Sequence, residues 1–180
     1  MSLRELTAQS HDRAENTQFM RRVFNKTMDL NTWADFTYQK CLFYNVIECA
    51  ANTCGLVHDI KDILRTHLLY KDYLEMIKDG PRHHFRPSTI EYYQYIMSIA
   101  NDPRKVLAHL YTWHMGDLYG GQMIKKIVDA PHNALEFTNK EELTTRLRAK
   151  LGDDLAEEAN RAFDFAIKIM ESYDTDMGQN

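Results

Sequence analysis

The sequence has little glycine, proline or cysteine: 180 residues contain 7 Gly, 4 Pro and 3 Cys. Because glycine and proline interrupt regular structure, their scarcity favours long, unbroken elements. The cysteines, Cys41, Cys49 and Cys54, are odd in number and form neither a C-x-x-C pair nor the C-x-x-C-H run that attaches heme covalently. We therefore expect reduced thiols, and no metal site at Cys49 and Cys54, because no His/Cys cluster accompanies them.

Long apolar runs and an excess of basic charge are also missing. No run approaches the roughly 20 apolar residues of a membrane helix, and no signal-peptide stretch follows the charged start. The 22 Lys+Arg against 26 Asp+Glu give a net charge of −4, which excludes the basic footprint of a nucleic-acid-binding protein. We expect a soluble, cytoplasmic protein without nucleic-acid or membrane partners, in which a few placed cations meet any anionic ligand.

Apolar residues, 44% of the chain, recur at three- and four-residue spacings almost throughout. This is the period of α-helices and not the alternation of strands, so the fold class is predicted to be all-α. A chain of this length buries roughly 70% of its extended surface on folding, which is enough for one core. We expect a single domain over residues 1–180.

Capping residues indicate where the helices begin. Ser2 with Glu5 predicts a capping box for a helix over residues 3–16, and Asn31 is expected to cap a long helix ending near residues 52–55. The other helices are expected over residues 18–25, 59–69 and 70–78, from the Ser88–Glu91 capping box, over 103–127 after Asp102, from the Thr138–Glu141 capping box, and from 154 after a stop at Gly152. Residues 80–87 are expected to form a loop.

A cluster of glycines breaks the local rules of the expected helix over residues 103–127. Gly116, Gly120 and Gly121 lie inside it, and each costs about 1 kcal/mol relative to alanine. Gly116 and Gly120 are four residues apart and share one face, while Gly121 lowers the resistance to bending. Two interpretations stay open: close packing against another helix, or bare backbone against a large, flat ligand.

A second candidate constellation lies in the first expected helix. His11 and Glu15 are four residues apart, so the carboxylate shares a face with the imidazole and can orient it. A metal-ligating histidine needs such support. The alternative is an ordinary polar pair on a solvated helix face.

Two segments carry a family resemblance. Residues 7–16 (TAQSHDRAEN) and 111–122 (YTWHMGDLYGGQ) resemble the two signature segments of heme oxygenase, in the same order and at a matching separation. Residues 157–163 (EEANRAF) resemble the family's final helix, so the likeness covers nearly the whole chain.

The resemblance implies a helical bundle that clamps heme b between a proximal and a kinked distal helix. It assigns His11 as the axial iron ligand, supported by Glu15. Gly116 and Gly120 would let the distal backbone lie over the porphyrin face. Asp117 matches the distal carboxylate, which holds the water network that delivers protons to iron-bound dioxygen.

Further positions are assigned by the same resemblance. Arg4 and Arg148 fall where the family anchors the heme propionates, although Arg148 is also compatible with a solvated helix face. Phe163 matches an aromatic near the ring and would look no different as plain core. Gly121 belongs to the heme-contacting glycines, and Tyr111 is expected to contribute a hydroxyl near the distal side.

The sequence also departs from the family pattern. Ala8 and Thr144 stand where many relatives carry lysine, so fewer charges anchor the propionates. Trp113 replaces a common arginine and Tyr119 a common serine, so a rearranged distal network is expected. This sequence shows no hydrophobic C-terminal anchor like that of the animal forms, which favours the soluble type.

The implied reaction uses heme as both substrate and cofactor, and converts it with O₂ and electrons to biliverdin, CO and Fe²⁺. The IXα isomer, a ferredoxin-like electron donor and a downstream bilin reductase are the expected product and partners. The competing hypothesis is a heme carrier or sensor on the same fold. A helical di-iron oxidase is disfavoured, because no glutamate is followed by histidine at Glu-x-x-His spacing.

Overall fold

Helices account for the regular structure of the computed structural model, which describes residues 1–174 and contains no strand among them. The predicted all-α class is therefore confirmed. The α-helices are α1 (Leu3–Glu15), α2 (Gln18–Phe24), α3 (Leu30–Thr53), α4 (Thr66–Ile77), α5 (Pro87–Ile99), α6 (Pro103–Leu110), α7 (Gly116–Tyr119), α8 (Gly121–Ile127), α9 (Lys140–Arg148) and α10 (Ala156–Glu171). Short turns connect them: the 3₁₀ turns η1 (Lys61–Ile63), η3 (Asn133–Leu135) and η4 (Asp153–Leu155), and the π-helical turn η2 (Tyr111–Met115). The domain predicted over residues 1–180 includes 175–180, which lie outside the described residues.

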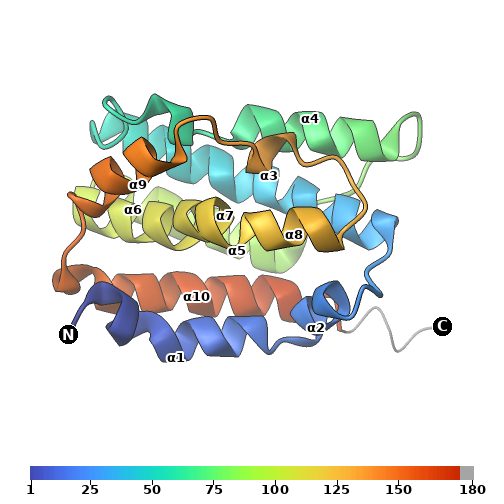
Figure 1. Ribbon diagram of the computed structural model, residues 1–180, viewed down its shortest axis with the longest axis horizontal. Coiled ribbons are helices and arrows are strands. Elements are labelled where there is room, and N and C mark those ends of the chain that lie inside the picture. The colour runs from blue at the N-terminus through green and yellow to red at the C-terminus, as the bar shows by residue number, and fades with distance from the viewer. Residues whose placement is uncertain (175–180) are drawn as a thin grey trace.

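The long helix α3 is the centre of the bundle. It packs against α4, α5 and α6, while α1 and α10 run side by side along another edge of the bundle (Figure 1). Phe43 and Ile47 of α3 are fully buried, as are Tyr92 of α5 and Leu107 of α6. None of the helices in the described part of the chain combines the length and apolar character of a membrane-spanning segment.

Two predicted N-caps are confirmed. The Ser2 hydroxyl accepts from the Glu5 N–H, and the Glu5 carboxylate accepts from the Ser2 N–H at 2.6 Å, which completes the capping box of α1. Asp102 accepts from the N–H groups of Arg104 and Lys105 at the start of α6.

Other predicted helix ends are wrong. Asp29, not Asn31, caps α3, because its carboxylate accepts from the Thr32 N–H at 2.8 Å. Helix α5 begins at Pro87, before the predicted capping residue Ser88, because a proline fits the first helical position, where no N–H is required.

The predictions around α9 also need correction. Helix α9 begins at Lys140 rather than at Thr138, and it has no side-chain cap. Gly152 does not end it: the helix stops at Arg148, and Gly152 follows in an extended conformation before η4.

The helix predicted over residues 59–69 is replaced by η1 and a later start of α4 at Thr66. The reason is a tertiary contact. The Glu48 carboxylate of α3 accepts from the N–H groups of Arg65, at 2.6 Å, and Thr66, at 3.2 Å. A carboxylate from a distant helix thus satisfies the first donors of α4.

The single helix predicted over residues 103–127 is interrupted twice. The π-helical turn η2 separates α6 from α7, and a turn at Gly120 separates α7 from α8. Glycine pairs and π-turns are recognised causes of helix bending. The low resistance to bending predicted for the glycine segment is thus seen as the turn at Gly120, and η2 adds a second interruption.

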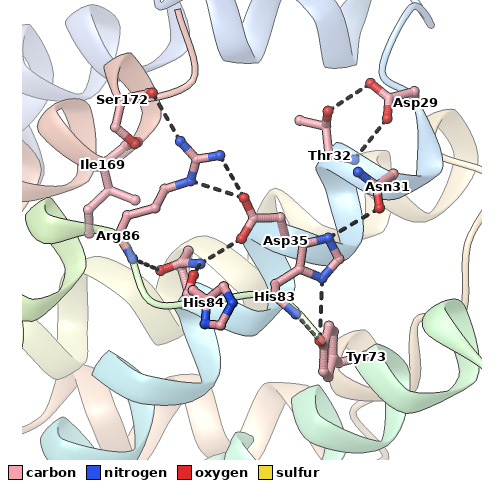
Figure 2. Close-up of polar contacts among 11 residues, drawn as sticks. Asp29, Asn31, Thr32, Asp35, Tyr73, His83, His84, Arg86, Ile169 and Ser172 are labelled. Atoms are coloured by element: carbon pink, nitrogen blue, oxygen red, sulfur yellow. Dashed lines mark hydrogen bonds and ion pairs between the residues drawn. The ribbon is translucent and has the colours of Figure 1, made fainter. Parts of the chain in front are cut away.

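The loop predicted over residues 80–87 is confirmed up to Arg86, since Pro87 already belongs to α5, and it is fastened to α3 (Figure 2). The Arg86 guanidinium donates to the Asp35 carboxylate at 2.6 Å and to the Ser172 carbonyl at 3.0 Å. Gln39 of α3 accepts from the Arg86 N–H and donates to the His84 carbonyl. This loop therefore joins α3 to the end of α10.

Candidate functional site

One large cavity opens between α1, α2 and α10 on one side and α7 and α8 on the other, with α3 at its back. It encloses about 1210 Å³ of space, part of it open to solvent. The lining is mostly apolar, and its titratable members are His11, Glu15, Lys40, Asp72, Asp117 and His132. A concave apolar site with a few polar groups is typical of a small-molecule or cofactor pocket.

Helix α1 brings His11 and Glu15 to this cavity. The His11 Nδ1 atom lies 3.8 Å from a Glu15 carboxylate oxygen, and both side chains are about half exposed. The Phe163 ring of α10 meets the imidazole edge-on, with 5.8 Å between ring centroids. Asp12 is close enough to share a metal ion with His11 and Glu15. The pair therefore lies in a cavity wall, where an imidazole nitrogen is available to a metal.

The glycines of the facing segment differ in what surrounds them. A Cβ atom on Gly116 would meet nothing within 4 Å, so this residue leaves bare backbone at an open part of the cavity. A Cβ atom on Gly121 would lie 2.8 Å from Leu135, and one on Gly120 would lie 3.1 Å from the Gly116 carbonyl oxygen. Gly121 therefore fits the close-packing interpretation, and the open space beside Gly116 is compatible with the ligand interpretation, which stays a prediction.

Asp117 is held by two residues of α3 that the sequence reasoning missed. The Lys40 ammonium donates to both carboxylate oxygens, at 3.0 and 3.1 Å, and the Tyr44 hydroxyl donates to one of them at 2.6 Å. Burial, and then the negative charge of Asp117, raises the pKa of Tyr44 well above its ordinary value, so its hydroxyl stays protonated. A signal was present: Lys40 is a charged residue within a mostly apolar stretch, four residues before Tyr44.

A second connection to α3 lies beside this one. The fully buried His114 ring contacts a Glu48 oxygen through Nε2 at 2.9 Å, and Thr66 donates to the other oxygen. Burial opposes the charge on Glu48, but the hydrogen bonds from His114, Arg65 and Thr66 outweigh it and lower the pKa of Glu48. The segment that precedes Gly116 is therefore anchored in the core.

Trp113, which also lines the cavity, begins a third polar chain. Its indole N–H donates to the Tyr92 hydroxyl at 3.1 Å, and that hydroxyl contacts His109 Nδ1 at 2.7 Å. His109 Nε2 contacts the Glu158 carboxylate at 3.0 Å, which also accepts from Tyr95. The Trp113 N–H therefore donates to α5 and not to Asp117. The positive charge beside Asp117 comes from Lys40 instead.

Three residues assigned by the resemblance lie outside the cavity lining. Arg4 is exposed on α1, and Tyr111 packs half-buried against the core. Arg148 is exposed on α9, with its guanidinium 5.5 Å from the centre of the Tyr119 ring. Of the two other departures from the family pattern, Ala8 is exposed and Thr144 is buried. The remaining assigned residues, namely His11, Glu15, Gly116, Asp117, Gly120, Gly121 and Phe163, all line the cavity.

Comparisons with known proteins identify the family and the fold of this chain. The chain is 26% identical to heme oxygenase 2 of Macaca fascicularis over 96% of its length, and it spans 64% of that relative. It is 33% identical to a heme oxygenase of Porphyra purpurea, with 73% of this chain and 59% of that protein covered. The crystal structure of heme oxygenase-1 from the cyanobacterium Synechocystis, in complex with heme, has the same fold, with a TM-score of 0.87, 21% identity, and coverage of 97% of this chain and 91% of that one. The model of the heme oxygenase family matches residues 1–172, and the chain therefore belongs to this family.

Proposed function

We propose that this protein is an enzyme that binds heme in the described cavity and cleaves it to biliverdin, CO and Fe²⁺. One observation carries the proposal: His11 on α1 and the bare backbone of Gly116 on α7 line the same apolar cavity, with the partly buried carboxylate of Asp117 beside the glycine. The Synechocystis structure of the same fold holds heme, which supports heme as the occupant here.

The residues of the cavity fit heme. The apolar lining would suit the porphyrin, the half-exposed His11 would offer an imidazole nitrogen to the iron, and Glu15 would help to orient that imidazole. Gly116 would let the ring approach the backbone, and Asp117 would hold water and pass protons beside it. Heme itself supplies the redox chemistry with O₂ and external electrons, while the protein supplies position and protons.

Other parts of the proposal rest on the sequence. Arg4 and Arg148 are proposed to meet the propionates at the rim, and Tyr111 to act behind the distal wall. A ferredoxin-like donor, the IXα isomer, a downstream bilin reductase, a cytoplasmic location and a single domain stay predictions.

An absorption titration with hemin tests the proposal, followed in the same cuvette by reduced ferredoxin, its reductase and NADPH under air. Loss of the heme band with growth of a biliverdin band is the expected result, and product chromatography identifies the isomer. A stable hemin complex that does not turn over, while a known heme oxygenase works in the same mixture, would replace the enzyme by the carrier or sensor. Absence of hemin binding would overturn both.

A further inference from the structure

Lys40 places a positive charge in the cavity wall. Its ammonium nitrogen lies 3.0 Å from Asp117 Oδ1 and 3.1 Å from Oδ2, across 77 positions of sequence. The two side chains are only 11% and 13% exposed. Water and salt screen such a sheltered pair far less than a surface pair, so its charges act strongly on their surroundings.

Lys40 and Tyr44 form one unit on α3. They are four residues apart and share a helix face, and the Lys40 ammonium lies 4.9 Å from the centre of the Tyr44 ring. Tyr44 donates to the Oδ2 atom of Asp117, and Lys40 donates to both oxygens. The carboxylate is thereby fixed against α3 in a single orientation.

Lys40 is also the only lysine or arginine among the described residues that line the cavity. Asp72, a buried carboxylate of the lining, accepts from the backbone N–H groups of Asn133 and Ala134 and is occupied in holding η3. Removal of the Lys40 charge would leave Asp117 as an uncompensated, largely sheltered negative charge in the wall.

We propose that Lys40 is a positioning residue for the heme reaction: it holds the Asp117 carboxylate against α3 and cancels its charge at the cavity wall. The inference rests on the proposed function, since it concerns the same cavity and the same ligand. This chain has Trp113 where the family commonly carries an arginine. Lys40 therefore supplies the positive charge beside Asp117.

The positive charge of Lys40 can be tested by ligand binding, without measuring turnover. In the ferric hemin complex of Lys40→Met, the unpaired negative charge of Asp117 should repel an anion that enters the cavity. It should not repel a neutral ligand. We expect the azide dissociation constant to rise about tenfold and the imidazole constant to change less than about twofold. Lys40→Arg should keep both constants, because it keeps the charge.

Asp117 provides the second half of a double-mutant cycle. Asp117→Asn alone leaves Lys40 unpaired and should tighten azide binding, and Lys40→Met with Asp117→Asn should return the azide-to-imidazole ratio toward the wild-type value. Biliverdin formation by Lys40→Met should slow while hemin still binds, and Lys40→Arg should restore it. Where Lys40→Met does not fold, Lys40→Gln replaces it in the cycle.

Arg86→Met is the matched control. It breaks the Arg86–Asp35 ion pair, which joins side chains 18% and 12% exposed at 2.6 Å, away from the cavity lining. It should lower stability without moving the azide-to-imidazole ratio. An unchanged ratio in a folded, hemin-binding Lys40→Met protein overturns this inference alone, as does an equal shift in Arg86→Met. Failure of the wild-type chain to bind hemin overturns the proposed function as well.

Discussion

Leu135 occupies the space that a side chain on Gly121 would need: its Cδ2 atom lies 2.8 Å from the position of a Cβ atom there. Five residues earlier, the same position on Gly116 has no neighbour within 4 Å. One of these glycines therefore permits internal packing, and the other leaves open space in the cavity wall. Substitution by alanine separates the two roles.

Gly121→Ala should destabilise the protein without heme. The new methyl group forces Leu135 to move, at a cost of roughly 1–3 kcal/mol, against which alanine gains about 1 kcal/mol in helix propensity. Urea unfolding followed by circular dichroism measures the net loss. In a Leu135→Ala background the penalty of Gly121→Ala should disappear, and an equal penalty in both backgrounds would contradict the contact.

Gly116→Ala should have the opposite effect on the heme-free protein. Its methyl group meets no atom, so the unfolding free energy should rise by about 0.5–1 kcal/mol, the usual gain of alanine over glycine in a helix. In the proposed heme complex the same methyl group would enter space that the porphyrin needs, and the hemin dissociation constant should rise about tenfold. An absorption titration measures it, and unchanged hemin affinity would separate Gly116 from the ligand.

His11→Ala should remove the imidazole that we propose binds the iron, and should shift the absorption bands of the hemin complex. Added free imidazole should restore the wild-type spectrum, because the deleted side chain leaves room for it beside α1. His132→Ala is the matched control, since His132 also lines the cavity but contacts the Val128 carbonyl at 2.8 Å through Nε2. A wild-type spectrum from His11→Ala would place the iron ligand on another residue.

Acid should destabilise the heme-free protein through His109. Burial lowers the pKa of His109 below its ordinary value of 6.5, and the Glu158 hydrogen bond opposes this only in part. Below about pH 6.5 the unfolded chain therefore binds a proton that the folded state does not take up, so the unfolding free energy falls as the pH falls.

The loss should reach at most about 1.4 kcal/mol per pH unit for this one proton. Glu158 adds to it at lower pH: burial opposes its charge, but hydrogen bonds from His109 and Tyr95 outweigh this and lower its pKa below 4.5. Chemical unfolding between pH 7.5 and 5.5, a range chosen around the ordinary pKa of histidine, measures the slope. The slope should shrink in His109→Gln and persist in His67→Gln, where the histidine is exposed. A flat wild-type profile would show that His109 gains no proton on unfolding.

Local sequence rules predicted the helices better than the contacts between them. The Ser2 and Asp102 caps could be predicted, because each satisfies backbone donors two or three residues away. The start of α4 could not, since Glu48 lies 17 residues from the first donor that it satisfies. His11 stood out because Glu15 follows four residues later, and the glycines stood out because each is unfavourable inside a helix. Lys40 was visible only as a charge in a mostly apolar stretch, and its role could not be predicted, because its partner Asp117 lies 77 positions away and meets it only in the folded chain.

The segment from Trp113 to Asp117 receives its shape from its neighbours. Its π-turn and Gly116 give it little stiffness of its own, whereas Glu48, Lys40 and Tyr44 are fixed on one unbroken helix of 24 residues. The contacts from α3 therefore determine the conformation of this segment. Directed variation of α3 is consequently a route to a reshaped pocket that leaves the family's signature residues untouched.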